Sequence, residues 1–313
     1  MPTILVTRKL PSSAIAILRG AGDVDANDGA LEPAELRVRV KGCDAVVCLL
    51  TDRIDAAFLD AAGSQLKIVA NVAVGFDNID VPAARARGVV VTNTPDVLTN
   101  ATAELTWALI LAITRRVVEG DRLIRRGGWS GWSLDFLTGS ELAGKQLGIV
   151  GGGRIGRAVA ERASVFGMRA VIAQHRTSTS AGPFPTMSFD ELLVSSDVVS
   201  LHVPLRAETR HLIDRRALAR MKRTTYLVNT ARGPVVDEEG LAWALRERLI
   251  AGAALDVFEH EPKVHPDLLP LENVVLAPHI GSATRETRGA MADLAARNVV
   301  AVLAGQAPLT PIP

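Results

Sequence analysis

Short apolar runs alternate with helix-like segments from the beginning of the chain. The first strands are predicted at residues 4–6, 44–50, 66–74 and 89–91. Residues 12–19 have helical character, with Pro11 and Ser12 near the start, and Pro95 marks a later break. This alternation is typical of βα units that build a parallel sheet.

One long helix is predicted over residues 99–124, because its apolar side chains recur at helical spacing. A loop with two tryptophans follows it, and a second series of βα units extends from residue 145 to about residue 281. The last helix is predicted over residues 285–303. Two such series in 313 residues predict an α/β fold with two similar, Rossmann-like domains, each built on a doubly wound parallel sheet.

Composition and charge remove several classes of function. The chain is 48% hydrophobic and 22% charged, and its net charge of +1 predicts no broad attraction to nucleic acid or to an anionic membrane. No stretch approaches the roughly 18 uninterrupted apolar residues that cross a bilayer, and the N-terminus reads as a strand rather than a signal peptide. We therefore expect a cytoplasmic protein. Cys43 and Cys48 read as buried free thiols, and the histidines lack the spacing of metal ligands, so no metal is expected.

A glycine-rich motif follows the apolar strand at residues 146–150. Gly151, Gly153 and Gly156 occupy the fixed positions of GxGxxG, and a helical pattern at residues 157–166 comes next. The three glycines permit a tight turn, close approach of a pyrophosphate, and close packing of helix on strand. The N–H groups at Arg154 and Ile155 would then face the phosphates. The motif alone is a weak signal, but its position between strand and helix predicts a dinucleotide site.

The strand after the glycine motif predicts which nucleotide is bound. NAD sites place an acidic residue about 20 residues beyond the glycines, where it holds the ribose hydroxyls. This chain has Gln174 there, followed by His175, Arg176 and Thr177. A cation without the repelling carboxylate suits a 2′-phosphate, so NADPH is expected to be preferred. In the alternative, Arg176 points to solvent and the enzyme accepts NADH as well.

Three polar side chains follow successive strands of the second series: Arg232, Glu261 and His279. In open α/β sheets ligands bind at the carboxyl ends of the strands. A guanidinium there can clamp a carboxylate and a neighbouring carbonyl. A histidine can supply a proton near neutral pH, and a carboxylate beside it favours the charged ring. Each residue alone could equally be structural, whereas the three together predict a catalytic site.

These motifs, in this order, resemble the D-2-hydroxyacid dehydrogenase family over nearly the full chain. The matching stretches are Val74-Gly75-Phe76-Asp77-Asn78-Ile79-Asp80, the glycine motif, Ser200-Leu201-His202-Val203-Pro204-Leu205, residues 229–233, Leu255-Asp256-Val257-Phe258 with Glu261-Pro262, and Pro278-His279-Ile280-Gly281-Ser282.

The resemblance implies roles for particular residues. His279 would protonate the carbonyl oxygen of a 2-ketoacid, Glu261 would raise its basicity, and Arg232 would bind the substrate. Glu259 is the local rival of Glu261, but the Glu-Pro position matches the family. The N–H groups of Val74 and Gly75 would hold the substrate carboxylate, and Asp256 would orient the nicotinamide carboxamide. Further cofactor contacts are implied for Thr102, Val203, Pro204, Thr230, Ala231, His279 and Gly281.

The resemblance also implies a domain plan. Residues 1–96 and 285–313 would form a discontinuous substrate-binding domain, and residues 97–284 a dinucleotide-binding domain, with the active site in the cleft between them. Within the second domain, residues at about 99–143 resemble the family's dimerisation helix and loop, so a homodimer is expected.

Residues 92–104 and 127–132 are similar to glyoxylate/hydroxypyruvate reductases, in which the second tryptophan of the loop reaches the partner's active site. Trp132 would have that role here, or would merely pack the dimer contact. The expected activity is reduction of a small 2-ketoacid, such as glyoxylate or hydroxypyruvate, to the D-2-hydroxyacid. Two alternatives stay open: a dehydrogenase for a bulkier 2-ketoacid, and a nucleotide-sensing, corepressor-like binding protein of the same fold.

Overall fold

The computed structural model describes residues 1–173 and 183–312. The chain divides into two compact units: a first unit, Met1–Leu98 with Ser282–Pro313, and a second unit, Thr99–Gly281. From the sequence, we expect the chain to pass from one domain to the other after residues 96 and 284. Each unit is built on its own parallel sheet, so the predicted class of two doubly wound α/β domains, the first one discontinuous, is confirmed.

The sheet of the first unit has the order β2-β1-β3-β4-β5, and all its strands are parallel. Its strands are β1 (Thr3–Val6), β2 (Asp23–Ala26), β3 (Ala45–Cys48), β4 (Ile68–Asn71) and β5 (Val90–Thr92). β3 and β4 are wholly buried, as expected where helices cover both faces of a sheet. The edge strand β2 carries two aspartates and no apolar run, which is why the pattern analysis did not find it.

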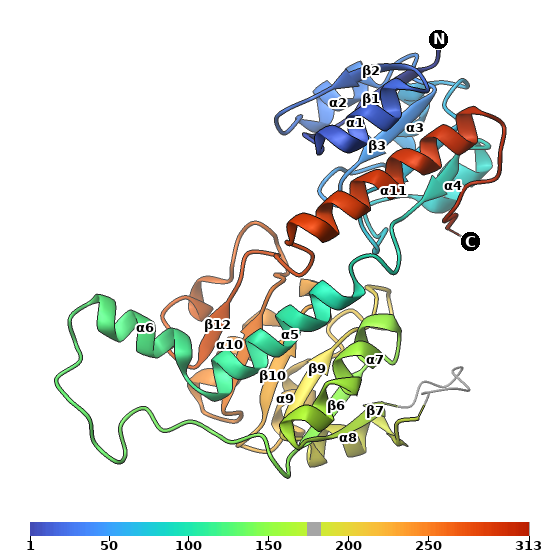
Figure 1. Ribbon diagram of the computed structural model, residues 1–313. Helices are drawn as coiled ribbons and strands as arrows, with labels where there is room; N and C mark the ends of the chain where they lie inside the picture. Colours follow the sequence, from blue (N-terminus) through green and yellow to red (C-terminus); the bar gives the residue numbers. More distant parts are fainter. Residues whose placement is uncertain (174–182, 313) are drawn as a thin grey trace. The chain divides into compact units, whose positions relative to one another are not determined.

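The helices of the first unit are α1 (Ser12–Arg19), α2 (Pro33–Arg39), α3 (Ala56–Ala62), α4 (Val81–Ala86) and α11 (Arg285–Leu303). Helices α1 and α11 have the predicted bounds and pack against each other (Figure 1). α11 begins at Arg285 because the hydroxyl of Thr284 accepts the N–H of Thr287 at 3.1 Å. The last helix of the chain therefore completes the unit in which the chain begins.

The sheet of the second unit has the order β12-β11-β10-β9-β6-β7-β8 and is also parallel throughout. Its strands are β6 (Gln146–Val150), β7 (Arg169–Ala173), β8 (Thr186–Met187), β9 (Val198–Leu201), β10 (Tyr226–Asn229), β11 (Gly252–Leu255) and β12 (Val274–Leu276). The strand order reverses between β6 and β9. Such a switch point is where open α/β sheets bind ligands, at the carboxyl ends of the strands.

The helices of the second unit are α5 (Thr99–Thr114), α6 (Val117–Arg125), α7 (Arg154–Glu161), α8 (Phe189–Ser195), α9 (Arg215–Arg220) and α10 (Glu238–Arg246), with short 3₁₀ turns η1 (Ala163–Phe166), η2 (Gly233–Val235) and η3 (Pro266–Leu268). α5 packs on α7, β10 and β11 (Figure 1). Trp107 of α5 stacks on Phe166 and donates from Nε1 to the carbonyl of Val159 at 3.0 Å. Among the described residues, no helix has the length and apolar character that crossing a membrane requires.

The prediction of one helix over residues 99–124 is wrong. Arg116 separates α5 from α6 and has a left-handed conformation, with φ of 53°. Its guanidinium binds the carboxylate of Glu119 at 2.6 and 2.8 Å, which holds the break in place. α5 is extensively buried, whereas α6 buries no side chain. Helical spacing extends across the break because two successive helices show the same period as one long helix.

The helix after the glycine motif also differs from its predicted bounds. It begins at Arg154 instead of residue 157, and the last turn of the predicted segment is the separate 3₁₀ turn η1. Gly167, with φ of 66°, ends that turn.

Candidate active site

The glycine loop joins β6 to α7 at the carboxyl ends of the second sheet. Gly151 has φ of 107°, and a Cβ there would lie 2.6 Å from the carbonyl carbon and oxygen of His202. A Cβ at Gly156 would overlap the carbonyl of Gly151, so the helix packs directly on the strand end. Among the described residues, no atom lies within 4 Å of a Cβ built at Gly153, which leaves space beside the backbone. These three environments fit the three tasks that a dinucleotide loop assigns to its glycines.

The N-terminus of α7 has the features of an anion site. Gly153 is the N-cap and provides no capping side chain. The main-chain N–H groups at Arg154 and Ile155, at the positive end of the helix dipole, therefore suit a pyrophosphate.

His202 follows β9 and lies against the glycine loop. The main-chain N–H of His202 donates to the carbonyl of Val150 at 2.7 Å, and the ring Nε2 lies 2.8 Å from the hydroxyl of Ser200. Burial of the ring lowers the pKa of His202 to about 3, so the imidazole is neutral at physiological pH. Its Nδ1 has no hydrogen-bond partner within the described part of the chain. Val203 and Pro204, both expected cofactor contacts, come directly after it.

Arg232 follows β10, and a local hydrogen-bond pattern holds its loop. The side chain of buried Asn229 accepts the N–H of Ala231 at 3.0 Å and donates to the carbonyl of Arg232 at 2.9 Å. Nη1 of Arg232 donates to the carbonyl of Ala231 at 2.9 Å. This role of Asn229 was not predicted from the sequence. An asparagine at a strand end, just before a turn, is the signal that indicates it.

Thr106 links the two threonines that are expected to contact the cofactor, Thr102 and Thr230. The hydroxyl of Thr106 donates to the carbonyl of Thr102 at 2.8 Å and lies 3.0 Å from the hydroxyl of Thr230. A Cβ built at Gly281 would lie 3.7 Å from the hydroxyl of Thr102 and 3.2 Å from a carboxylate oxygen of Asp256. The structure thus gathers Thr102, Thr230, Asp256 and Gly281 in one region of the second unit.

His279 is held at the end of β12 by Asp256. The residue has a left-handed conformation, with φ of 54°, and its N–H donates to the main-chain carbonyl of Asp256 at 2.8 Å. The Asp256 carboxylate accepts the next two N–H groups, those of Ile280 at 2.7 Å and Gly281 at 2.8 Å. Burial raises the pKa of Asp256, while these N–H donors and the charge of His279 act against the rise. Asp256 therefore shapes the turn that presents the histidine.

His279 and Glu261 form a hydrogen-bonded pair, with 2.8 Å between Nδ1 and Oε2. The other carboxylate oxygen of Glu261 accepts the N–H of Phe258 at 3.1 Å. Burial alone raises the pKa of Glu261, but the bond and charge of His279, the Phe258 donor and the charge of Arg232 outweigh it, so the pKa is lowered. Glu259 binds Arg210 and His211 instead. Of the two rival glutamates, Glu261 is therefore the one that contacts His279.

Some predicted site residues lie elsewhere. Val74 and Gly75 belong to the first unit, where the amides of Asn93 and Asn71 bind their carbonyls at 2.8 and 2.9 Å. Among the described residues, the N–H groups of Val74 and Gly75 donate no hydrogen bond. The predicted 2′-phosphate contacts lie outside the described residues: Gln174, His175, Arg176 and Thr177.

The tryptophan loop belongs to an arm, defined here as residues 115–139, that extends from the second sheet (Figure 1). The arm leaves and returns at one place, because the N–H of Ser140 donates to the carbonyl of Thr114 at 2.8 Å. Its tip exposes apolar side chains, with Trp132 79% exposed. The exposed apolar residues of the arm are Val117, Ile124, Trp129, Trp132, Leu134 and Phe136.

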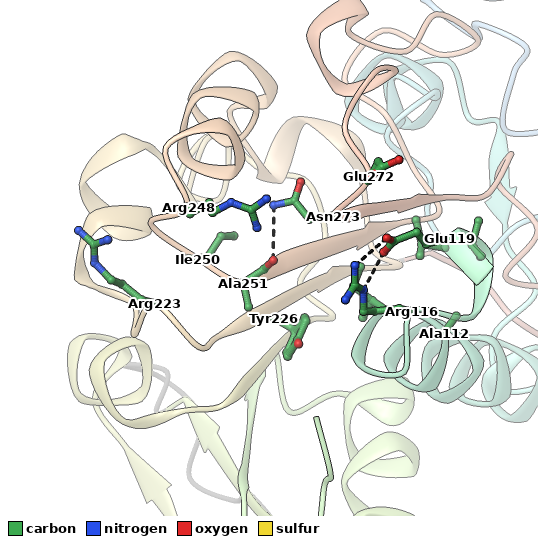
Figure 2. Close-up of a pocket in the computed structure, with 13 residues that line it drawn as sticks. Ala112, Arg116, Glu119, Arg223, Tyr226, Arg248, Ile250, Ala251, Glu272 and Asn273 are labelled. Atoms are coloured by element: carbon green, nitrogen blue, oxygen red, sulfur yellow. Dashed lines mark hydrogen bonds and ion pairs between the residues drawn. The ribbon is translucent and has the colours of Figure 1, made fainter. Parts of the chain in front are cut away.

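The second unit also has a cavity of about 380 Å³ far from these strand ends (Figure 2). Tyr226, Ala251 and Asn273 line it at the amino ends of β10, β11 and β12, together with Arg116 and Glu119. Arg232, Glu261 and His279 are at the opposite ends of those strands. This cavity is therefore not the candidate active site.

A dinucleotide loop at the switch point, with an arginine and a histidine–glutamate pair at the neighbouring strand ends, defines a class, the nicotinamide-dependent dehydrogenases. Residues 107–281 match the NAD-binding domain of D-isomer specific 2-hydroxyacid dehydrogenases. The chain belongs to this family, as its sequence motifs predict, and is an NAD(P)-dependent D-2-hydroxyacid dehydrogenase.

Similar proteins cover the chain from end to end. A glyoxylate reductase of Thermofilum pendens is 51% identical over 317 residues, which span 98% of this chain and 93% of that protein. A solved structure from Thermus thermophilus has a TM-score of 0.94 at 48% identity and covers 99% of this chain and 100% of its own. An NADPH-dependent glyoxylate/hydroxypyruvate reductase from Sinorhizobium meliloti has a TM-score of 0.88 at 34% identity, with coverages of 100% and 98%.

Proposed function

We propose that the protein reduces a small 2-ketoacid, glyoxylate or hydroxypyruvate, to the D-2-hydroxyacid with NADPH as the preferred hydride donor. The observation that carries the proposal is the 2.8 Å bond between His279 and Glu261, beside the charge of Arg232. Relatives about half identical to this chain are glyoxylate reductases, which favours a small substrate.

The proposed chemistry follows from the atoms that remain available. Nδ1 of His279 is engaged by Glu261, so Nε2 is the atom that gives a proton to the carbonyl oxygen. A nicotinamide cofactor, held at the glycine loop and the first turn of α7, would supply the hydride for the carbonyl carbon. Proton and hydride together convert the ketoacid to the hydroxyacid. Glu261 stabilises the charged ring before the transfer, and Arg232 binds the carboxylate and polarises the carbonyl through its planar donor fork.

Several further roles belong to the same proposal. Asp256, by holding the N–H groups of Ile280 and Gly281, fixes the turn that carries His279. It is also the residue that we assign to the nicotinamide carboxamide. The N–H groups of Val74 and Gly75 are the donors we assign to the substrate carboxylate. We also propose a cytoplasmic location, which cell fractionation would check.

The preference for NADPH rests on sequence. The expected ribose-binding acid is replaced by Gln174, and Arg176 lies two residues later. A hydrogen bond to a charged group contributes about 1.5–3 kcal/mol. That energy corresponds to a preference of about ten- to a hundred-fold. The Sinorhizobium meliloti relative is itself NADPH-dependent.

A kinetic panel tests substrate and cofactor together. We expect the highest kcat/KM for glyoxylate or hydroxypyruvate with NADPH, a lower value with NADH, and lower values for pyruvate, phenylpyruvate and longer 2-ketoacids. Arg176→Ala is expected to remove the preference for NADPH and to leave kcat/KM with NADH within about twofold. Arg246→Ala, which removes an exposed ion pair with Asp267 away from the cofactor site, serves as the matched control.

Three results of the panel would contradict parts of the proposal. No turnover of any ketoacid would favour the corepressor-like alternative, and best turnover of phenylpyruvate would favour a bulkier substrate. A parent enzyme that prefers NADH, or an Arg176→Ala variant with unchanged preference, would reject the role given to Arg176.

We propose in addition that the arm forms a homodimer contact and that Trp132 reaches the partner's substrate site. Apolar side chains gathered on an arm with no buried helix face are the mark of an interaction surface. Light scattering is expected to give twice the mass of the chain. Trp132→Ala should raise the KM for glyoxylate several-fold, while Val165→Ala, at an exposed apolar residue of η1, should not. A fully active monomer would refute the contact.

A further inference from the structure

The loops that carry Arg232 and Glu261 pack backbone against backbone. We define the Arg232 loop as residues 230–235 and the Glu261 loop as residues 256–262. A Cβ at Gly233 would overlap the carbonyl of Phe258, so the close approach requires glycine there. The N–H of Phe258 in turn donates to the Glu261 carboxylate at 3.1 Å. A shift at Phe258 or Glu259 would therefore move the carboxylate that holds His279.

His211 contacts both loops. Its main-chain N–H donates to the carbonyl of Pro234 in the Arg232 loop at 2.8 Å. Its ring Nε2 lies 2.7 Å from the carboxylate of Glu259 in the Glu261 loop. The residue has a left-handed conformation, with φ of 50°, which is unusual for a residue other than glycine and marks positions where tertiary contacts outweigh the local cost.

We propose that His211 is a positioning residue for catalysis, whose main chain anchors the Arg232 loop and whose imidazole anchors the Glu261 loop. Through these contacts Glu261 stays within hydrogen-bond distance of His279. The inference rests on the proposed function and adds a residue that neither motif nor spacing indicates.

The charges around Glu259 make the imidazole contact important. Its carboxylate, only 12% exposed, binds both the His211 ring at 2.7 Å and Arg210 at 2.9 Å. The Arg210 side chain is 52% exposed and the His211 side chain 40%, so solvent screens the contact with the arginine more. The main-chain N–H of Glu259 donates to the buried carboxylate of Glu238 at 2.6 Å. Burial raises the pKa of Glu238, and the N–H groups of Glu259 and His265 partly offset this. Without the His211 ring, Glu259 would keep the exposed arginine and the repulsion of the Glu238 carboxylate.

The main-chain contact and the ring contact of His211 are expected to affect KM and kcat differently. Any residue other than proline at position 211 keeps the main-chain N–H that donates to Pro234, so the Arg232 loop and substrate binding should survive a substitution. Loss of the ring frees Glu259, and Glu261 then stabilises the charged form of His279 less well. We therefore expect kcat to fall while KM stays nearly constant, and the alkaline limb of ketoacid reduction to move to lower pH.

The test compares His211→Leu with His211→Gln in the full chain. Both side chains must adopt the same left-handed backbone conformation, and only glutamine keeps a hydrogen-bond donor for the Glu259 carboxylate. His211→Leu should lower kcat for glyoxylate about tenfold, by analogy with outer-shell partners whose loss costs about 10–100-fold, with KM within about twofold. His211→Gln should recover most of kcat and the parent's pH limb. Arg210→Ala, the matched control at the other partner of Glu259, should change kcat less than about threefold.

A readout independent of turnover separates this inference from the proposed function. The ¹⁵N NMR titration of the His279 imidazole, assigned with His279→Asn, should move to lower pH in His211→Leu and return in His211→Gln. An inactive parent would contradict the proposed function alone, because the titration still decides the role of His211. Unchanged titration in His211→Leu, equal behaviour of the two variants, or a loss carried by KM would overturn the inference.

Discussion

Replacing Arg232 with alanine should lower kcat/KM for glyoxylate by about 10²–10³-fold, the usual cost of removing one preorganised donor at a reacting oxygen. The guanidinium is the proposed contact to both the carboxylate and the carbonyl, and an alanine leaves the developing charge without it. Steady-state oxidation of NADPH measures the effect. Arg232→Lys, which keeps the charge but loses the planar fork, should retain an intermediate activity.

The fold should survive this substitution. The loop is held by the Asn229 side chain and by the packing of Gly233 on Phe258, and neither contact uses the guanidinium. The melting temperature is expected to change by no more than about 4 °C. Arg246→Ala, which removes an exposed ion pair with Asp267, is the matched control and should stay within about twofold of the parent. Near-normal kcat/KM in Arg232→Ala would contradict the substrate-binding role assigned to Arg232.

Replacing His279 with asparagine should reduce kcat by about 10²–10⁴-fold, the range of a positioned general acid. Asparagine is chosen because it tolerates the left-handed conformation observed there, so the turn held by Asp256 should persist. The same assay measures the loss, and a thermal melt confirms the fold. A variant that keeps a tenth of the parent's kcat would exclude His279 as the proton donor.

The companion variant Glu261→Gln tests the pairing by pH. Because its pKa is lowered, Glu261 is ionised across the neutral range. A carboxylate hydrogen-bonded to the imidazole favours the charged form of the ring. Reduction consumes the charged ring, so its rate falls as pH rises. Removing the carboxylate should move that falling limb to lower pH while much of kcat at acidic pH remains. A limb at the parent's position would count against the pair.

The fold was predictable where burial imposes a period. Helices α1 and α11 have their predicted bounds because local signals mark their ends: Pro11 and Gly20 flank α1, and Thr284 caps α11. The polar edge strand β2 was missed, since two aspartates on an exposed edge leave no apolar run. The break at Arg116 was missed because its cause, an ion pair and a change of surroundings from buried to exposed, is not a matter of period.

The site shows the same division. Arg232, Glu261 and His279 were predicted because polar residues after buried strands converge at one edge of a parallel sheet. The roles of Asn229 and His211 were not predicted. Their contacts depend on how loops distant along the chain settle against each other: His211 and Glu259 are 48 residues apart. No local sequence pattern indicates such a long-range contact.

The closing of the arm at Thr114 and Ser140 has a consequence for how the chain can evolve. Because the arm begins and ends at one hydrogen-bonded point, its length and composition can change without altering the register of any strand. The arm is therefore an insertion that can vary while the sheet and helices around it keep their structure. Lineages of this fold can therefore lengthen, shorten or replace this exposed apolar segment while the residues at the strand ends are inherited unchanged.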